Sequence, residues 1–334
     1  MRGMLWSQPG CDPCEFRIAV TSVCRGRNPG EVLYSLETDE ISGVFALDAA
    51  GVEQRLFHTA DFRVRNVAVH PDGTSIAISV AHDRVTSDIA ILDQDGSNLR
   101  EVSEGDSIDQ SPRWVPGAGR RLVFQSAGIG RDSAGRYSES GRFAVQLLDL
   151  DSGDIECLAE DPDADLLGPQ MDATGALYYI HRPHKKKSGV DPVGIAKDTV
   201  LFPFRMSYAF FQFFNFFSMR YTGRPLATSK GAAQQTPDLK RMMLWGNLID
   251  ADRAARESRF GDADAPSLVP PSWKLVRQSS TGKQVVAEGV LSFDIAADGS
   301  VLYSNGSAVH RIESDAGRSE RLLVGQMIEQ VAAL

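Results

Sequence analysis

The residues best suited to chemistry in this 334-residue chain are Cys11 and Cys14, which are spaced as a CxxC. A structural zinc site needs a second pair of ligands at similar spacing. The other two cysteines, Cys24 and Cys157, belong to no second CxxC or CxxH. A redox CxxC is typical of a thioredoxin-like βαβ unit, which the surrounding sequence does not offer. We therefore expect a structural or incidental pair, with no metal and no cofactor.

The histidines and aspartates give no stronger motif. Asp161, Asp163 and Asp165 alternate as in some calcium loops, but the remaining ligands are missing, so we expect a solvated loop between strands. His70 follows a predicted strand, and we expect it to end that strand rather than to bind a ligand. GxSxG, P-loop, HExxH and GxGxxG motifs are absent from the sequence. We therefore expect no enzyme and assign no catalytic residue.

The elements that carry these residues are marked by two kinds of recurring turn. The first kind joins the inner two strands of a repeat and occurs at residues 70–73, 115–119, 172–175 and 297–299. The second joins the outer two strands and occurs at residues 48–51, 93–96, 151–153, 280–282 and 315–317. Gly73 and Gly119 are 46 positions apart, and Gly51 and Gly96 are 45 apart. This period is typical of a propeller blade of four antiparallel strands.

The turn count predicts how the propeller closes. Five outer turns stand against four inner ones, so the chain is expected to begin inside a blade, with residues 16–20 as its second strand. The innermost strand of that blade would then be the last segment, 327–334, which would remove an open edge. We predict an all-β propeller of five blades, with six as the alternative. The expected blades are about 15–60 with 326–334, then 61–105, 106–161, 162–288 with an insert, and 289–325.

The clearest repeat, residues 66–96, carries a family resemblance. A strand, Pro71-Asp72-Gly73, a returning strand and then Ile-x-Ile-Leu-Asp-x-Asp-Gly at 89–96 resemble the TolB-type propeller repeat. The pattern is also similar to the propellers that precede prolyl-oligopeptidase-type hydrolase domains. Such propellers usually have six blades, and the resemblance implies protein–protein contact as the main use.

A long insert interrupts the fourth repeat. We divide the chain into residues 1–183 with the first blades, an insert at 184–271, and the remaining blades with the closing strand at 272–334. Eight of the 16 phenylalanines lie within residues 202–217, and we expect an aromatic helix from 204 to about 222. Thr236 and Pro237 predict the start of a second helix, at 237–259.

The aromatic helix leaves three interpretations open. It could pack internally on the propeller, dock a partner protein, or lie in a membrane interface, since its uncharged run of residues 206–219 is too short to span a bilayer. We expect the partner-binding residues to be Phe210, Phe213, Phe214, Phe217, Lys185, Lys186 and Lys187.

Bulk composition and one loop complete the expectations. The formal charge of -9 disfavours a nucleic-acid partner. The first residues lack the apolar run of a secretory signal, so we expect a cytoplasmic protein. Gly128–Gly141 is expected to form a polar loop, either disordered or used for contacts. The function predicted is a non-catalytic scaffold for protein–protein interaction. The alternatives are a hydrolase or lyase with its site in the propeller channel, and a peripheral membrane adaptor.

Overall fold

The computed structural model describes residues 18–83, 85–117, 119–184, 241–244, 247–250, 265–313, 319–325 and 327–334. Every regular element among these residues is a strand. Within this part of the chain, no helix is long and apolar enough to cross a membrane. The chain divides into two compact units, Met1–His184 with Met242–Leu334, and Lys185–Arg241. The predicted aromatic helix lies outside the described residues, as does nearly all of the second unit.

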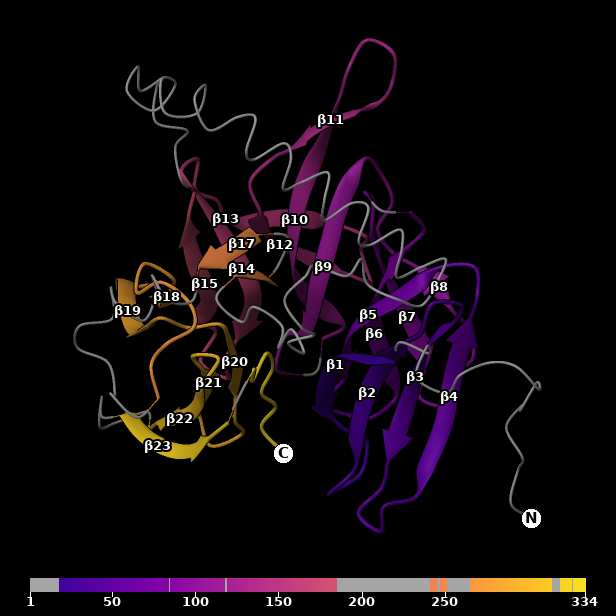
Figure 1. Ribbon diagram of the computed structural model, residues 1–334. Coiled ribbons are helices and arrows are strands. Elements are labelled where there is room, and N and C mark those ends of the chain that lie inside the picture. The colour runs from indigo at the N-terminus through magenta and orange to yellow at the C-terminus, as the bar shows by residue number, and fades with distance from the viewer. Residues whose placement is uncertain are drawn as a thin grey trace, which may run out of the picture. The chain divides into compact units, whose positions relative to one another are not determined.

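Five antiparallel sheets of the first unit are the blades of a five-bladed β-propeller (Figure 1). Blade 1 contains β1 (Ala19–Arg25), β2 (Val32–Glu37), β3 (Ser42–Leu47) and β4 (Glu53–Thr59). Blade 2 contains β5 (Arg63–Val69), β6 (Ser75–Ala81), β7 (Asp88–Asp93) and β8 (Arg100–Glu101). Blade 3 contains β9 (Ser107–Trp114), β10 (Arg121–Arg131), β11 (Tyr137–Ser140), β12 (Ala144–Asp149) and β13 (Ile155–Ala159). Blade 4 contains β14 (Ala164–Met171), β15 (Leu177–Pro183), β18 (Lys274–Ser279) and β19 (Gly282–Glu288). Blade 5 contains β20 (Ser292–Ile295), β21 (Val301–Ser304), β22 (Ala308–Ile312) and β23 (Ser319–Val324). The prediction of an all-β, five-bladed propeller is confirmed.

The hydrophobic core lies between neighbouring blades rather than within one sheet. Leu33 and Val44 of blade 1 pack with Ile76 and Ile78 of blade 2 in one cluster of fully buried side chains. The second blade's remaining apolar face packs against Trp114, Leu122 and Phe124 of blade 3. The middle strands are therefore buried on both faces, which explains the continuous apolar runs of β6 and β7.

Side chains on the two inner strands of blades 1 to 4 link each of these blades to the next. The innermost strands of blades 1 to 4 each have a register shift, and polar side chains satisfy the backbone groups there. Val67 N donates to Ser22 Oγ (3.0 Å), Ser111 N to Asn66 Oδ1 (3.3 Å), and Gly168 N to Gln125 Oε1 (2.7 Å). The Gln170 amide donates to Phe293 O (3.0 Å) and accepts from Ile295 N (3.2 Å). We call these five hydrogen bonds the inter-blade bonds.

The C-terminal segment 327–334 joins blade 5 to blade 1 without forming a strand. Ile328 O accepts a hydrogen bond from Ser304 Oγ (2.7 Å), and Ala333 N donates to Asp294 Oδ2 (2.7 Å), both in blade 5. On the other side, the Gln330 amide bonds Val23 N and Thr21 O of β1, each at 3.0 Å. The predicted closing strand is therefore wrong, although the segment does connect the two blades.

The error in the strand count has a local cause. The innermost strand of blade 1 is β1 itself, and the turn that follows it is Asn28-Pro29-Gly30, which lacks the aspartate present in three of the four predicted inner turns. Gly30 has φ of +76°, and Glu31 N bonds Asn28 O at 3.0 Å, as in the other tight turns. Of the second strand expected at 16–20, Ala19 and Val20 belong to the innermost strand β1, while residues 16 and 17 lie outside the described part of the chain.

Two further segments differ from expectation. Residues 128–141 form a β-hairpin in which β10 continues past its sheet and pairs with β11 (Figure 1). Residues 241–244 and 247–250 form a two-stranded sheet, β16 (Arg241–Leu244) with β17 (Asn247–Asp250), in place of the predicted helix at 237–259. Short apolar runs are ambiguous between helix and strand, and Gly246 interrupts this one.

Candidate functional site

The partner-binding residues predicted from the sequence lie outside the described residues. These are Lys185, Lys186, Lys187, Phe210, Phe213, Phe214 and Phe217. Cys11 and Cys14 also lie there, so their roles stay predictions. Cys24 is buried beside the blade 2 core, and burial raises the pKa of its thiol to about 12, while Cys157 is an exposed free thiol. Neither cysteine lines the cavity described next.

A cavity of about 1160 Å³ opens along the innermost strands of blades 1 to 4. Its polar and charged lining residues are Thr21, Glu37, Arg63, Arg65, Asn66, Asp83, Thr86, Ser87, Gln110, Gln125, Ser140, Arg142, Asp165, Arg182, His184, Glu329 and Gln330. A smaller cavity of about 70 Å³ shares Asn66, Leu167 and Gln330 with it and is lined by more apolar groups, among them Phe293 and Ile180. The innermost strands therefore surround a channel with a wide polar end.

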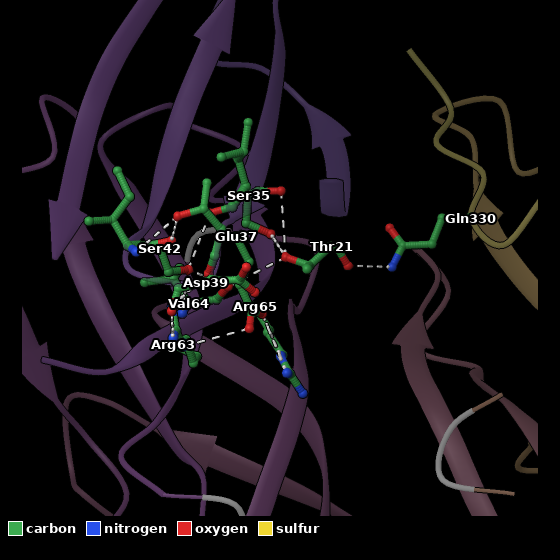
Figure 2. A network of polar contacts seen from close by, with 12 residues as sticks. Thr21, Ser35, Glu37, Asp39, Ser42, Arg63, Val64, Arg65 and Gln330 are labelled. Carbon is green, nitrogen blue, oxygen red and sulfur yellow. Dashed lines mark hydrogen bonds and ion pairs between the residues drawn. The ribbon is translucent and has the colours of Figure 1, made fainter. Parts of the chain in front are cut away.

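One side of the cavity is a network centred on Glu37 at the end of β2. Arg63 and Arg65, two positions apart on β5, both approach this carboxylate, at 3.7 Å from Arg63 Nε and 3.4 Å from Arg65 Nη2. Arg63 also donates to the Thr38 carbonyl (2.9 Å) and the Asp39 carbonyl (2.6 Å), which fixes its guanidinium (Figure 2). One carboxylate thus pairs with two guanidinium groups, and these three side chains together carry one net positive charge.

The same network connects to the C-terminal segment. Figure 2 shows the Gln330 amide bonded to the Thr21 carbonyl, while the Thr21 hydroxyl bonds Ser35 Oγ at 2.8 Å. Ser42 Oγ accepts from Val64 N (2.9 Å), so blade 1 and blade 2 are joined beside the arginines. These contacts hold β1 and β5 in place, and the arginine pair is therefore presented on a fixed surface.

The opposite side contains a buried ion pair. Asp165 on β14 pairs with Arg182 on β15 at 2.9 Å, and both side chains are more than nine-tenths buried. Asp165 also accepts from Phe143 N (3.1 Å), and Arg182 lies over the Trp273 ring at 5.4 Å. The expected solvated loop is thus wrong for Asp165. Asp161 does lie in an exposed loop, where it accepts from Asp163 N at 2.9 Å.

Four further ionisable side chains complete the lining, namely Asp83, Arg142, His184 and Glu329. Asp83 accepts from Thr86 N (2.6 Å) and Val85 N (2.7 Å), and these backbone donors lower the pKa of its carboxyl. Arg142 is half-buried just before β12, and within the described part of the chain its guanidinium forms no ion pair. Glu37 and Asp165 are already paired, so the groups best placed for a ligand are Arg65 and Arg142.

The lining offers several kinds of group to a polar ligand. Within it, the carboxylates of Glu37, Asp83 and Asp165 are engaged by guanidinium or backbone N–H groups. Amide and hydroxyl side chains supply further donors and acceptors, which match the polar groups of a peptide.

Part of this site had a sequence signal that was missed. Arg63 and Arg65 alternate with Val64 in β5, and a period of two places both on one face of the strand. Glu37, Arg142 and Arg182 come from three other strands or loops, and only the closure of the propeller brings them together.

Comparisons with known proteins support the fold. No family model and no curated protein matches the sequence. Among solved structures, TolB from Acinetobacter baumannii is 13% identical with a TM-score of 0.51, over 94% of this chain and 56% of that one. The chain thus spans little more than half of that TolB. A putative TolB from Agrobacterium tumefaciens is 14% identical with a TM-score of 0.49, over 93% of this chain and 84% of that one. A chain of a nidogen/laminin complex is 8% identical with a TM-score of 0.50, over 91% and 79%. The fold is a TolB-like β-propeller.

Proposed function

We propose that this chain, a TolB-like β-propeller, is a non-catalytic binding module that receives an acidic segment of a partner protein in its channel. The observation that carries the proposal is the pair Arg63 and Arg65 sharing the single carboxylate of Glu37 inside the large cavity. An added carboxylate from a partner would give this arginine pair a second counter-charge. Arginine is well suited to this because its planar guanidinium binds carboxylates through two parallel hydrogen bonds.

The size and lining of the cavity favour a peptide over a small molecule. Its volume of about 1160 Å³ exceeds the roughly 300–1,000 Å³ of small-molecule sites. Amide side chains such as Gln110, Gln125 and Asn66 offer both donors and acceptors at its wall. A peptide backbone requires both kinds of partner when it leaves water. Nucleic acid is disfavoured as the anionic ligand because a net charge of -9 repels a long polyanion that spreads over the surface, whereas a short acidic segment in the channel meets the local arginine pair.

The aromatic stretch around Phe210, Phe213, Phe214 and Phe217, with Lys185, Lys186 and Lys187, is proposed as a second contact to the same partner. Its support is the sequence alone. Aromatic residues and methionine are enriched at the centres of protein interfaces, and this stretch contains half of the chain's phenylalanines. A membrane surface is the alternative ligand for these residues.

The channel proposal is tested with labelled acidic, neutral and basic peptides of equal length, measured by fluorescence anisotropy. We expect acidic peptides to bind best, and binding to weaken as salt screens the arginines. The double variant Arg65→Glu with Arg142→Glu should weaken binding about tenfold or more, since two charges of like sign then face the ligand. The control variant is Arg55→Glu, an exposed arginine on the outer strand β4, which should bind as the parent does.

A photo-crosslinking residue at Gln110 in the channel would identify the natural partner, with Arg55 as the control position. Crosslinks are expected to map to an Asp- or Glu-rich segment. Equal binding of basic and acidic peptides would contradict the proposal. So would turnover of a peptide or glycoside substrate that the channel double variant abolishes, because it would establish the enzyme alternative.

A further inference from the structure

Three side chains with metal-binding chemistry meet at one edge of blade 2. His82 directly follows β6, Asp88 begins β7, and Glu101 ends β8. One ligand atom of each lies within 4.8 Å of the others, and His82 Nε2 is 3.0 Å from Glu101 Oε1. Adjacent strands place them together, since β6 pairs with β7 through Val80 and Asp88, and β7 pairs with β8 through Ala90 and Glu101.

Asp88 is the residue that points to a ligand. Its side chain is more than nine-tenths buried, and Oδ1 has no hydrogen-bond partner among the described residues. Burying a carboxylate without a partner is costly, and buried charges are normally paired or coordinate a metal. The carboxylates of Asp109, Glu101 and Glu104 also act on Asp88, as does His82. A cation bound here would offset these neighbouring carboxylates.

The imidazole of His82 is held in place from the other side. Its ring packs edge-on against Phe62, with the ring centroids 5.3 Å apart, and Phe62 in turn stacks on Phe57 at 6.2 Å. Its Nε2 is directed at the Glu101 carboxylate. Packing of this kind reduces the side-chain entropy that ordering a ligand would otherwise cost.

We propose that His82, Asp88 and Glu101 bind one divalent transition-metal ion, with Zn²⁺ as the ion to test. One imidazole nitrogen with two carboxylate oxygens is a ligand set that zinc accepts, whereas calcium prefers oxygen ligands in greater number. The three side chains fill part of a tetrahedral shell, so the fourth position belongs to water or to a partner side chain. None of these three residues lines the proposed peptide channel.

The test uses the full chain with Cys11→Ser and Cys14→Ser, so that the CxxC pair cannot contribute to metal binding. After dialysis against a chelator, Zn²⁺ is titrated by calorimetry. We expect about one zinc per chain at this site and a higher melting temperature in its presence, because a ligand that binds only the folded state stabilises it. Glu101→Gln and His82→Gln should each weaken zinc binding by about tenfold or more.

Asp88→Asn separates metal binding from a structural role. The metal-free variant is expected to melt no lower than the parent, since it removes a buried charge, but zinc should no longer raise its melting temperature. Glu156→Gln, an exposed acid on the outer strand β13, is the matched control and should bind zinc normally. Failure to bind zinc, or full binding by Asp88→Asn and Glu101→Gln, would overturn the site. Calcium binding as tight as zinc binding would overturn the choice of a transition metal.

Discussion

At the scale of single residues, aspartates at equivalent turn positions perform the same task in three blades. Asp72 Oδ1 accepts from Thr74 N (2.8 Å), and its partners lower the pKa of the Asp72 carboxyl to about 2. Asp172 bonds Thr174 N in the same way (2.8 Å), as Asp298 bonds Ser300 N (2.9 Å). All three aspartates lie in the inner turns predicted at 70–73, 172–175 and 297–299, and these turns could be predicted because an Asx turn is a local structure that needs only neighbouring residues.

Glu31 is the residue whose ionisation should matter most for stability at the missed inner turn. Its buried carboxylate forms an ion pair with Arg27 and accepts from Arg27 N (2.7 Å) and Asn28 N (3.1 Å). The Arg27 guanidinium is the main cause that lowers the pKa of Glu31 from 4.5. A carboxyl whose pKa is lower in the folded state contributes stability above its unfolded pKa, and this contribution is lost as pH falls through the folded value.

We therefore predict that Glu31→Gln loses about 1–3 kcal/mol of unfolding free energy at pH 7, as expected for removing charged hydrogen bonds from a buried site. Urea unfolding from pH 7 to pH 3 would measure it. The difference in unfolding free energy between variant and parent should stay constant above pH 4.5 and become smaller below it. Glu40→Gln, at an exposed acid nearby, is the control and should show little loss at any pH. A gap that does not narrow in acid would mean that packing, not charge, is responsible.

At the scale of elements, the inter-blade bonds explain why polar residues stand on otherwise apolar inner strands. Asn66 and Ser111 are an example, since they lie at the register shifts of β5 and β9, and Ser111 N donates a hydrogen bond of 3.3 Å to Asn66 Oδ1.

 Asn66 has a φ angle of +51° and Ser111 one of +55°. Both lie in the left-handed region, which is uncommon for residues other than glycine and which the hydrogen bond between them supports here. These bonds therefore fix both the bend of each inner strand and its distance from the next blade.

The Gln330 side chain acts as the corresponding link between the C-terminal segment and blade 1. Its amide accepts from Val23 N and donates to Thr21 O, so one side chain occupies hydrogen-bonding positions that an additional strand would have used. Removing it leaves a part-buried N–H and C=O of β1 without this partner. Leaving such groups unsatisfied costs about 1–3 kcal/mol.

We predict that Gln330→Ala lowers the melting temperature by several degrees, and that deleting residues 327–334 lowers it further because the bonds to Asp294 and Ser304 are lost as well. Thermal unfolding followed by circular dichroism would measure both changes. Glu329→Ala, at the exposed neighbouring residue, is the matched control. If Gln330→Ala has the same melting temperature as this control, the segment does not stabilise the junction between blades 5 and 1.

Elements marked by their own turn residues could be predicted from the sequence, and those defined by distant contacts could not. Most of the recurring turns contain an aspartate and a glycine and so predicted the blades, whereas the turn Asn28-Pro29-Gly30 was not recognised because it has no aspartate. The apolar run at β16 and β17 fits either periodicity over so few residues. The channel was beyond prediction because its arginines and carboxylates come from four blades.

At the scale of the whole molecule, the interrupted blade 4 shows how a long insertion is tolerated. β15 and β18 pair directly, with His181 opposite Lys274, although some ninety residues of sequence separate them. Ser267, Val269 and Trp273, which precede β18, are buried against blades 4 and 5. Because the closure cost of a loop grows only slowly with its length, the insertion adds little penalty to this pairing.

The last prediction follows from this pairing and concerns the second unit, Lys185–Arg241. We replace it with a flexible Gly/Ser linker of about twelve residues, whose mean reach is roughly 20 Å. The propeller should stay folded, with an unchanged β-sheet circular dichroism spectrum and a melting temperature within a few degrees of the parent, because its core clusters are formed by the five blades. A control chain carries Phe210→Ser, Phe213→Ser and Phe217→Ser in the intact insert.

The outcome for binding then separates the two proposed contacts. If the channel alone recognises the partner, both altered chains should bind acidic peptides and the crosslinked partner as the parent does. If the aromatic stretch is a second contact, both chains should keep peptide binding in the channel and lose affinity for the whole partner. Unfolding of the linker chain would contradict the prediction, since the insert would then be part of the propeller's core. Unfolding of the serine variant as well would assign that role to the phenylalanines, because they are the only residues the two chains lack in common.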